Sequence, residues 1–154
     1  MKNIFFIFLV ILLFECFQIS KIKSTNSQIF DNIDLKNGKW KIVGRVYNLS
    51  AVNKLLKDNK YNLQLYTDFV VNDIYEINEF VKNFRGKKNQ TKFSFYSDEI
   101  FISFYKNNKK VNEARIFFTN KECEVSTFNS SFNVDYYTLA KSLSFFKSLH
   151  KINS

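Results

Sequence analysis

Side chains able to perform acid–base or nucleophilic chemistry are few and scattered in this sequence. Asp73, Glu76 and Glu79 are closely spaced, as a general acid and its base would need to be. On a helix, the same spacing is typical of an N-terminal cap followed by a solvated face. The single histidine, His150, lies four residues from the end of the sequence and has no metal-ligand spacing around it. The sequence therefore predicts that the protein is not an enzyme and has neither a metal site nor a cofactor.

The N-terminal segment has the pattern of a secretion leader. Residues 4–14 are continuously apolar and follow Lys2. A run of this length is too short for a membrane-spanning helix, which needs about 20 residues, but it suits the core of a signal peptide. We expect residues 1–24 to be the signal peptide, residues 25–37 an N-terminal arm and residues 38–154 a single domain. The expected location is the secretory pathway, ending outside the cell or in a vacuole.

Cysteine usage argues against a disulfide-stapled scaffold. Of the two cysteines, Cys16 lies in the predicted leader, so Cys123 alone would remain. One thiol cannot form an internal disulfide. We expect Cys123 to be buried in a strand.

The chain is basic, with 23 Lys and Arg against 14 Asp and Glu and a formal charge of +9. Removing the leader takes away three lysines and one glutamate, which leaves +7. The basic residues are scattered rather than striped, and a secreted chain rarely meets nucleic acid, so no nucleic-acid partner is expected. Lys87 with Lys88, and Lys109 with Lys110, fall in predicted turns. These two pairs predict weak contact with anionic surfaces.

Alternating apolar and polar residues predict a mostly β domain. Trp40, Ile42, Gly44 and Val46 alternate with mainly polar neighbours, as in a strand with one buried side. A second alternating run covers residues 61–71. Four shorter candidate strands, separated by polar breaks, predict an antiparallel meander. These four cover residues 91–97, 100–105, 111–118 and 123–128.

Three other segments favour helices to different degrees. Residues 50–59 predict a short helix that Ser50 caps. Residues 73–85 carry apolar side chains at helical intervals, with Gly86 as a possible stop, although a pure barrel would need a strand there. Residues 135–150 fit a strand followed by a helix or a helix throughout, with Asp135 as the cap. We therefore expect one to three helices.

Two short motifs resemble those of the lipocalins. Gly38 and Trp40, with Arg45 five residues after the tryptophan, are similar to the motif that opens the first lipocalin strand. Asp135 and Tyr136 are similar to a second motif between late strands, with Val134 in place of threonine. No arginine follows Arg115, although the family has a late arginine that stacks on the tryptophan. The resemblance implies an antiparallel meander that closes into an eight-stranded barrel.

A lipocalin-like barrel implies a secreted carrier that encloses one small hydrophobic ligand such as a lipid, a sterol or haem. The residues expected to line its cavity are Val46, Leu65, Phe69, Phe93, Phe95, Ile102 and Phe104. The same apolar side chains would also suit a solid core. The alternative is an α+β curled sheet with packed helices, which would be a secreted interaction module acting through its surface.

Overall fold

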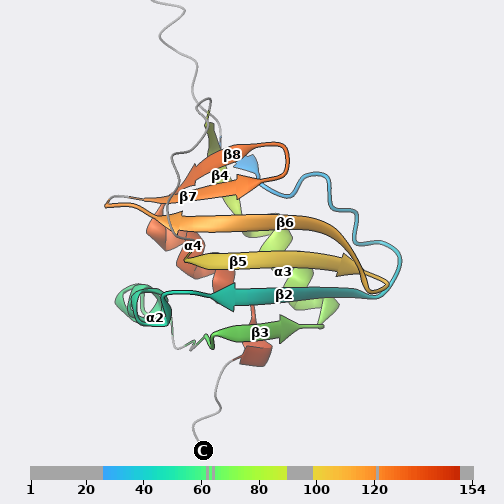
Figure 1. Ribbon diagram of the computed structural model, residues 1–154, viewed down its shortest axis with the longest axis horizontal. Helices are drawn as coiled ribbons and strands as arrows, with labels where there is room; N and C mark the ends of the chain where they lie inside the picture. Colours follow the sequence, from blue (N-terminus) through green and yellow to red (C-terminus); the bar gives the residue numbers. More distant parts are fainter. Residues whose placement is uncertain (1–25, 62, 64, 90–98, 121, 150–154) are drawn as a thin grey trace, which may run out of the picture.

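The computed structural model describes residues 26–61, 63, 65–89, 99–120 and 122–149, in which eight antiparallel strands form one sheet (Figure 1). The strands are β1 (Ser27–Gln28), β2 (Trp40–Val46), β3 (Asp68–Val71), β4 (Arg85–Asn89), β5 (Ile100–Lys106), β6 (Lys109–Phe118), β7 (Cys123–Thr127) and β8 (Ser131–Val134). The helices are α2 (Leu49–Asp58), α3 (Ile74–Asn83) and α4 (Tyr136–Leu143), with a 3-10 turn, η1 (Lys147–Leu149). The prediction of a mostly β, antiparallel domain with a few short helices is confirmed.

The sheet is open in the described part of the chain. Its strand order is β1-β4-β8-β7-β6-β5-β2-β3, so β1 and β3 are its edges. A closed barrel is therefore not confirmed, and the arrangement agrees with the alternative, a curled sheet with packed helices. The connection from β3 runs through α3 to β4, which lies next to the other edge strand, β1. Helices α3 and α4 lie against one face, here called the inner face (Figure 1).

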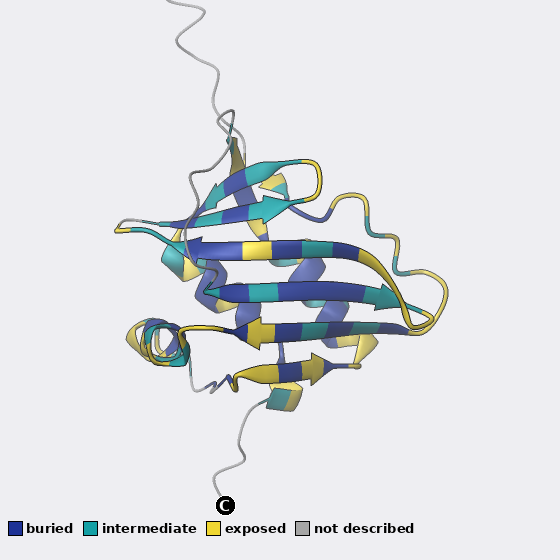
Figure 2. Ribbon diagram, in the orientation of Figure 1, coloured by how far each residue is buried: buried dark blue, intermediate teal, exposed yellow. Residues whose placement is uncertain are grey.

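The space between the inner face and the helices is filled by aromatic side chains. The ring centroids of Phe30 and Phe104 are 4.6 Å apart, and those of Phe80 and Phe146 are 4.7 Å apart. Phe84 packs beside Phe80 at 5.1 Å. All five rings are fully buried. Figure 2 shows that buried residues run along the middle strands of the sheet and the helices behind it. Close packing of this kind gives a solid core.

Four of the expected strands correspond to β2, β5, β6 and β7. The strand expected over residues 61–71 is shorter, because only Asp68–Val71 pairs with β2. Strand β4 lies where the sequence suggested the end of a helix, and Gly86 is inside it rather than at a helix stop. A Cβ on Gly86 would crowd Val134 and Phe132 of β8, so a glycine permits this close approach. The strand expected over residues 91–97 lies outside the described residues.

Both ambiguous segments contain helices with side-chain caps. Asp73 accepts hydrogen bonds from the amides of Tyr75 and Glu76 and so begins α3. Asp135 caps α4 in the same way through Thr138. The prediction that Ser50 caps the first helix was wrong: Asn48 accepts the hydrogen bond from the amide of Ala51. Each cap satisfies an amide that has no partner inside its own helix.

The N-terminal arm is part of the folded domain. Ser27 and Gln28 pair with β4, and the next two residues, Ile29 and Phe30, are buried. Phe30 contacts rings from α3 and β5, so this segment supplies a central core side chain. None of the helices in the described residues is both long and apolar enough to span a membrane.

Candidate functional site

The described residues that were predicted to line a ligand cavity belong to the core. Val46, Leu65, Phe69, Ile102 and Phe104 are at most 4% exposed and pack within one hydrophobic cluster. The surface hollows beside Trp40, beside α3 and beside β1 are not lined by these side chains. Phe93 and Phe95 lie outside the described residues. Since these side chains fill the interior, the surface is the place for a candidate site.

The tryptophan of the lipocalin-like motif lies at one end of the sheet. Its indole N–H donates to the carbonyl oxygen of Asn37 at 3.0 Å, and the ring is 8% exposed. The ammonium group of Lys106 lies 5.3 Å from the ring centroid, within the range of a cation–π contact. A lysine thus covers the ring where the resemblance implies an arginine. Gly38 has a φ of +95°, a backbone conformation that favours glycine.

The other motif residues have structural contacts. Arg45 is exposed and pairs with Asp68 of β3 at 2.7 Å. The hydrogen bond and charge of Asp68 raise the pKa of Arg45. Asp135 is the cap of α4, and the hydroxyl of Tyr136 donates to the carbonyl oxygen of Thr119. These contacts tie β2 to β3 and the start of α4 to the end of β6.

The clustered carboxylates of α3 also have structural partners. Asp73 is the cap, Glu76 accepts from Ser148, and Glu79 is 3.4 Å from the side-chain amide of Asn83. No group of three or more metal-ligating side chains occurs among the residues that the structure describes. Each of these carboxylates thus has a hydrogen-bond partner within the fold.

Cys123 is fully buried in β7. Burial is the largest cause of a strong rise in the pKa of its thiol, with smaller contributions from Asp135 and Glu122. A thiol in this environment stays protonated and is a poor nucleophile.

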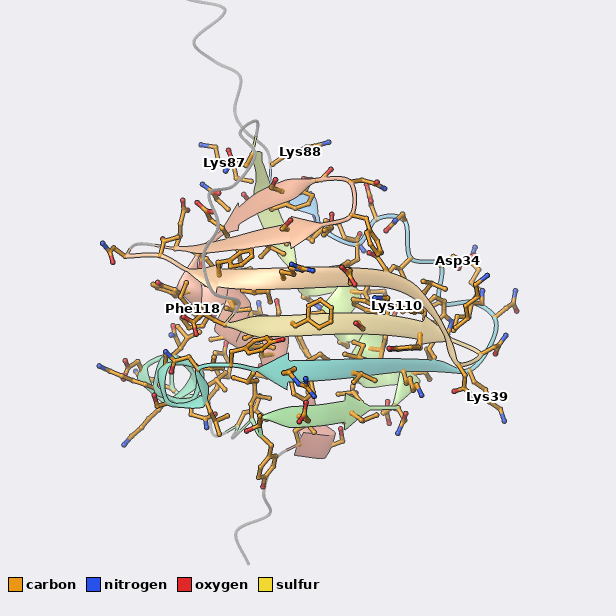
Figure 3. The ribbon with its side chains drawn as sticks, in the orientation of Figure 1. Asp34, Lys39, Lys87, Lys88, Lys110 and Phe118 are labelled. Carbon is orange, nitrogen blue, oxygen red and sulfur yellow. The ribbon has the colours of Figure 1, made fainter. Side chains whose placement is uncertain are left out.

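The two lysine pairs singled out in the sequence lie in different regions (Figure 3). Lys109 and Lys110 begin β6, directly after the turn that joins it to β5. Lys87 and Lys88 are exposed on β4 rather than in a turn, four strands away from β5 in the sheet. The prediction that both pairs lie in turns was wrong, because residues 87–88 pair with β8 and residues 109–110 pair with β5, so each pair belongs to a strand.

Six lysines from three segments gather at the end of the sheet where β2 and β6 begin and β3 and β5 end. We call this cluster the basic end. Lys41 of β2, Tyr105 of β5 and Lys110 of β6 are register partners across three strands, and Lys41 lies 5.2 Å from the Tyr105 ring centroid. Lys106 and Lys109 are partners across the hairpin. The basic end consists of Lys36, Lys39, Lys41, Lys106, Lys109 and Lys110.

A tight hairpin turn connects Lys106 to Lys109 and holds both beside Lys39. Asn107 and Asn108 have φ values of 50° and 66°, as the centre of a two-residue hairpin turn requires. The side-chain oxygen of Asn107 accepts from the amide of Lys39 at 2.9 Å, and the amide of Asn107 donates to the carbonyl oxygen of Lys39 at 2.8 Å. The hairpin is thereby fixed against the segment that leads into β2.

Acidic residues offset only part of this charge. Glu113 pairs with Lys110 at 2.7 Å. Asp34 accepts from the backbone amide of Lys36, and Asp73 is occupied by the amides at the start of α3. Among the described residues, the other five lysines of the basic end form no salt bridge. The basic end therefore carries excess positive charge available to an anion.

Two surface hollows adjoin the basic end and share Ile74. The first, of about 390 Å³, is lined by Gly38, Lys39, Trp40, Lys41, Asn72, Ile74 and Asn108. The second, of about 610 Å³, lies between the N-terminal segment and α3 and has mainly apolar walls that include Ile33, Leu35, Ile74, Tyr75 and Val81. Ile74 is 48% exposed and Tyr75 is 63% exposed. Both hollows thus combine lysines with mainly apolar walls, and they lie side by side.

A third hollow, of about 240 Å³, lies beside β1 and the turn between β7 and β8. Lys88 and the exposed ring of Phe128 are among its lining residues. Asn112 forms part of its wall, and the side-chain amide of Asn112 donates a hydrogen bond to the side-chain oxygen of Asn32. None of the six lysines of the basic end lines this polar hollow.

Comparison of the chain with family models, with curated proteins and with solved structures gives no match. The geometry of the chain therefore carries the functional argument. Sequence reasoning singled out Lys109 and Lys110 but missed Lys36, Lys39, Lys41 and Lys106 as their companions. The available signal was the Asn-Asn turn between Lys106 and Lys109, which brings the two ends of a hairpin together.

Proposed function

We propose that the protein is a secreted interaction module that binds an anionic partner through the basic end. The observation that carries this proposal is the convergence of six lysines from three segments on one end of the sheet, with only one of them in a salt bridge among the described residues. Charge of one sign gathered at one site attracts anions and steers their approach.

The filled interior favours a surface function over a carrier function. A ligand inside the domain would have to displace rings such as Phe80 and Phe104, which are fully buried and packed against Phe30. Displacing such rings would sacrifice close packing that stabilises the fold. The basic end needs no such rearrangement, because its side chains lie at the surface or are only partly buried.

Titration of the protein with fluorescently labelled dextran sulfate tests the proposal. We expect saturable binding that weakens as salt is raised, because the Debye length falls from about 8 Å at physiological ionic strength to about 3 Å at 1 M. The double variant Lys39→Glu with Lys109→Glu should bind much more weakly.

The matched control is Lys87→Glu with Lys88→Glu, which changes the net charge by the same amount at a distant strand. This control should keep most of the binding. Equal losses in the two double variants would show that net charge alone governs binding, and would overturn the assignment to the basic end.

A further inference from the structure

We infer that the anionic partner is the surface of a lipid bilayer that contains anionic phospholipids. This inference rests on the proposed function, because it names the partner of the same site. A bilayer presents negative headgroups and, directly beneath them, hydrocarbon. The basic end presents lysines and exposed apolar side chains together, so it matches both layers.

The apolar part of the match consists of three exposed side chains at the same end of the sheet. Ile74 and Tyr75 are 48% and 63% exposed at the start of α3. Val111, two residues after Lys109, is 43% exposed at an irregularity in the pairing of β5 with β6. Large apolar side chains amid lysines suit an interfacial contact, in which the apolar groups enter the boundary and the cations remain at headgroup level.

The two adjoining hollows combine lysines with mainly apolar walls. Lys39, Lys41, Asn72 and Asn108 are among the residues that line the hollow containing Trp40, and this hollow suits a negatively charged headgroup. The neighbouring hollow is mainly apolar and suits part of an acyl chain. Ile74 belongs to both walls, so a single amphiphile can occupy the two together.

The position of Trp40 supplies a direct test. It is the single tryptophan of the chain and lines the basic hollow. We would measure flotation with phosphatidylcholine vesicles that contain or lack phosphatidylserine. In parallel, we would follow quenching of tryptophan fluorescence by phosphatidylserine with brominated acyl chains. The expected results are binding that requires phosphatidylserine, loss of binding in high salt, and quenching of Trp40 in the bound state.

Charge variants locate the contact. A lysine near an anionic membrane contributes about 1 kcal/mol, which is about a 5-fold change in affinity. Lys39→Glu with Lys109→Glu should therefore weaken binding by at least about 25-fold. Lys87→Glu with Lys88→Glu should retain most of the affinity. Since all variants share one N-terminus, any contribution of the leader is the same in each.

Apolar variants separate a bilayer from a soluble polyanion. Tyr75→Ala should weaken vesicle binding and leave dextran sulfate binding unchanged. Tyr47→Ala is the matched control, because Tyr47 is 58% exposed at the opposite end of β2. It should change neither.

Several outcomes would overturn the inference. Equal binding to vesicles with and without phosphatidylserine would do so, as would saturating binding without quenching of Trp40. Binding of dextran sulfate through the basic end without vesicle binding would remove the bilayer and leave the proposed function intact. Failure to bind either probe would remove both.

Discussion

Glu76 of α3 and Ser148 of η1 are joined by two hydrogen bonds across 72 residues of sequence. The carboxylate accepts from the backbone amide of Ser148 at 2.8 Å and from its hydroxyl at 2.7 Å. Glu76 is only 7% exposed, so these bonds satisfy a largely buried acceptor. They also hold η1 against α3, and η1 contacts the edge strand β3 as well.

Glu76→Ala should destabilise the fold, because it leaves both donors of Ser148 without this acceptor. Ser148 is exposed, so water can replace the lost acceptor, and the cost is that of the hydrogen bonds to the carboxylate, about 1.5–3 kcal/mol. Urea unfolding followed by circular dichroism measures the change. Glu79→Ala on the same helix is the control and should stay within about 0.5 kcal/mol, because Glu79 is half-buried and makes one long side-chain contact. Similar losses in the two variants would contradict the role given to Glu76.

Gly44 and Phe69 give a second prediction. They are register partners in β2 and β3, and a Cβ on Gly44 would overlap the ring of Phe69. Gly44→Ala should therefore cost about 1–3 kcal/mol through overpacking. In the background of Phe69→Ala the same substitution should cost much less, since the ring is gone. A double-mutant cycle of unfolding free energies measures this coupling, and additive effects would show that the ring does not restrict position 44.

The aromatic core gives a third prediction. Phe146 is fully buried and packs on Phe80 and on Phe69. Phe146→Ala should lower the free energy of unfolding by about 3–5 kcal/mol, as expected for the loss of a core ring. Phe128, which is 64% exposed, is the control, and Phe128→Ala should change stability by less than about 0.5 kcal/mol. Thermal unfolding of the unaltered protein and of both variants measures these changes. Equal unfolding midpoints for all three proteins would contradict the solid core.

The strands with one buried face were predictable because their sequences alternate. In β2, for example, Trp40, Ile42 and Val46 face the core, while Lys41 and Arg45 do not. Strand β4 reads Arg-Gly-Lys-Lys-Asn and has no such alternation. Its strand conformation arises from pairing with β8 and β1, which the local sequence does not encode. The open sheet was not predictable from the strands alone, because closure depends on where α3 lies.

The candidate site was only partly predictable for a similar reason. Lys109 and Lys110 were visible as a pair in sequence, but Lys39 and Lys106 are separated by 66 intervening residues and meet through strand pairing and the Asn107 turn. Composition alone does not separate a ligand cavity from a solid core, because buried core residues and cavity-lining residues are of the same types. Phe104 was expected beside a ligand, whereas the ring of Phe30 occupies that position.

Cys123 gives a prediction of pH dependence. Burial raises the pKa of its thiol well above the ordinary value of 9.0, so the folded protein keeps the proton under mildly alkaline conditions. The unfolded chain releases this proton as the pH rises through about 9. The unfolded state then binds fewer protons than the folded state, so the free energy of unfolding must fall as the pH rises above this value.

The contribution of Cys123 to this fall should approach about 1.4 kcal/mol per pH unit, the value for a difference of one proton. Urea unfolding between about pH 8 and about pH 10.5 measures the slope, and Cys123→Ala isolates the share of the thiol. The variant is expected to be less stable at pH 8 because it loses buried volume, but its stability should fall less steeply with pH. Tyrosine ionisation is common to both proteins and cancels in the comparison except at Tyr136, whose pKa is raised mainly by burial and in smaller part by Cys123. Identical slopes would mean that the thiol titrates alike in the folded and unfolded chains, and would contradict its burial in β7.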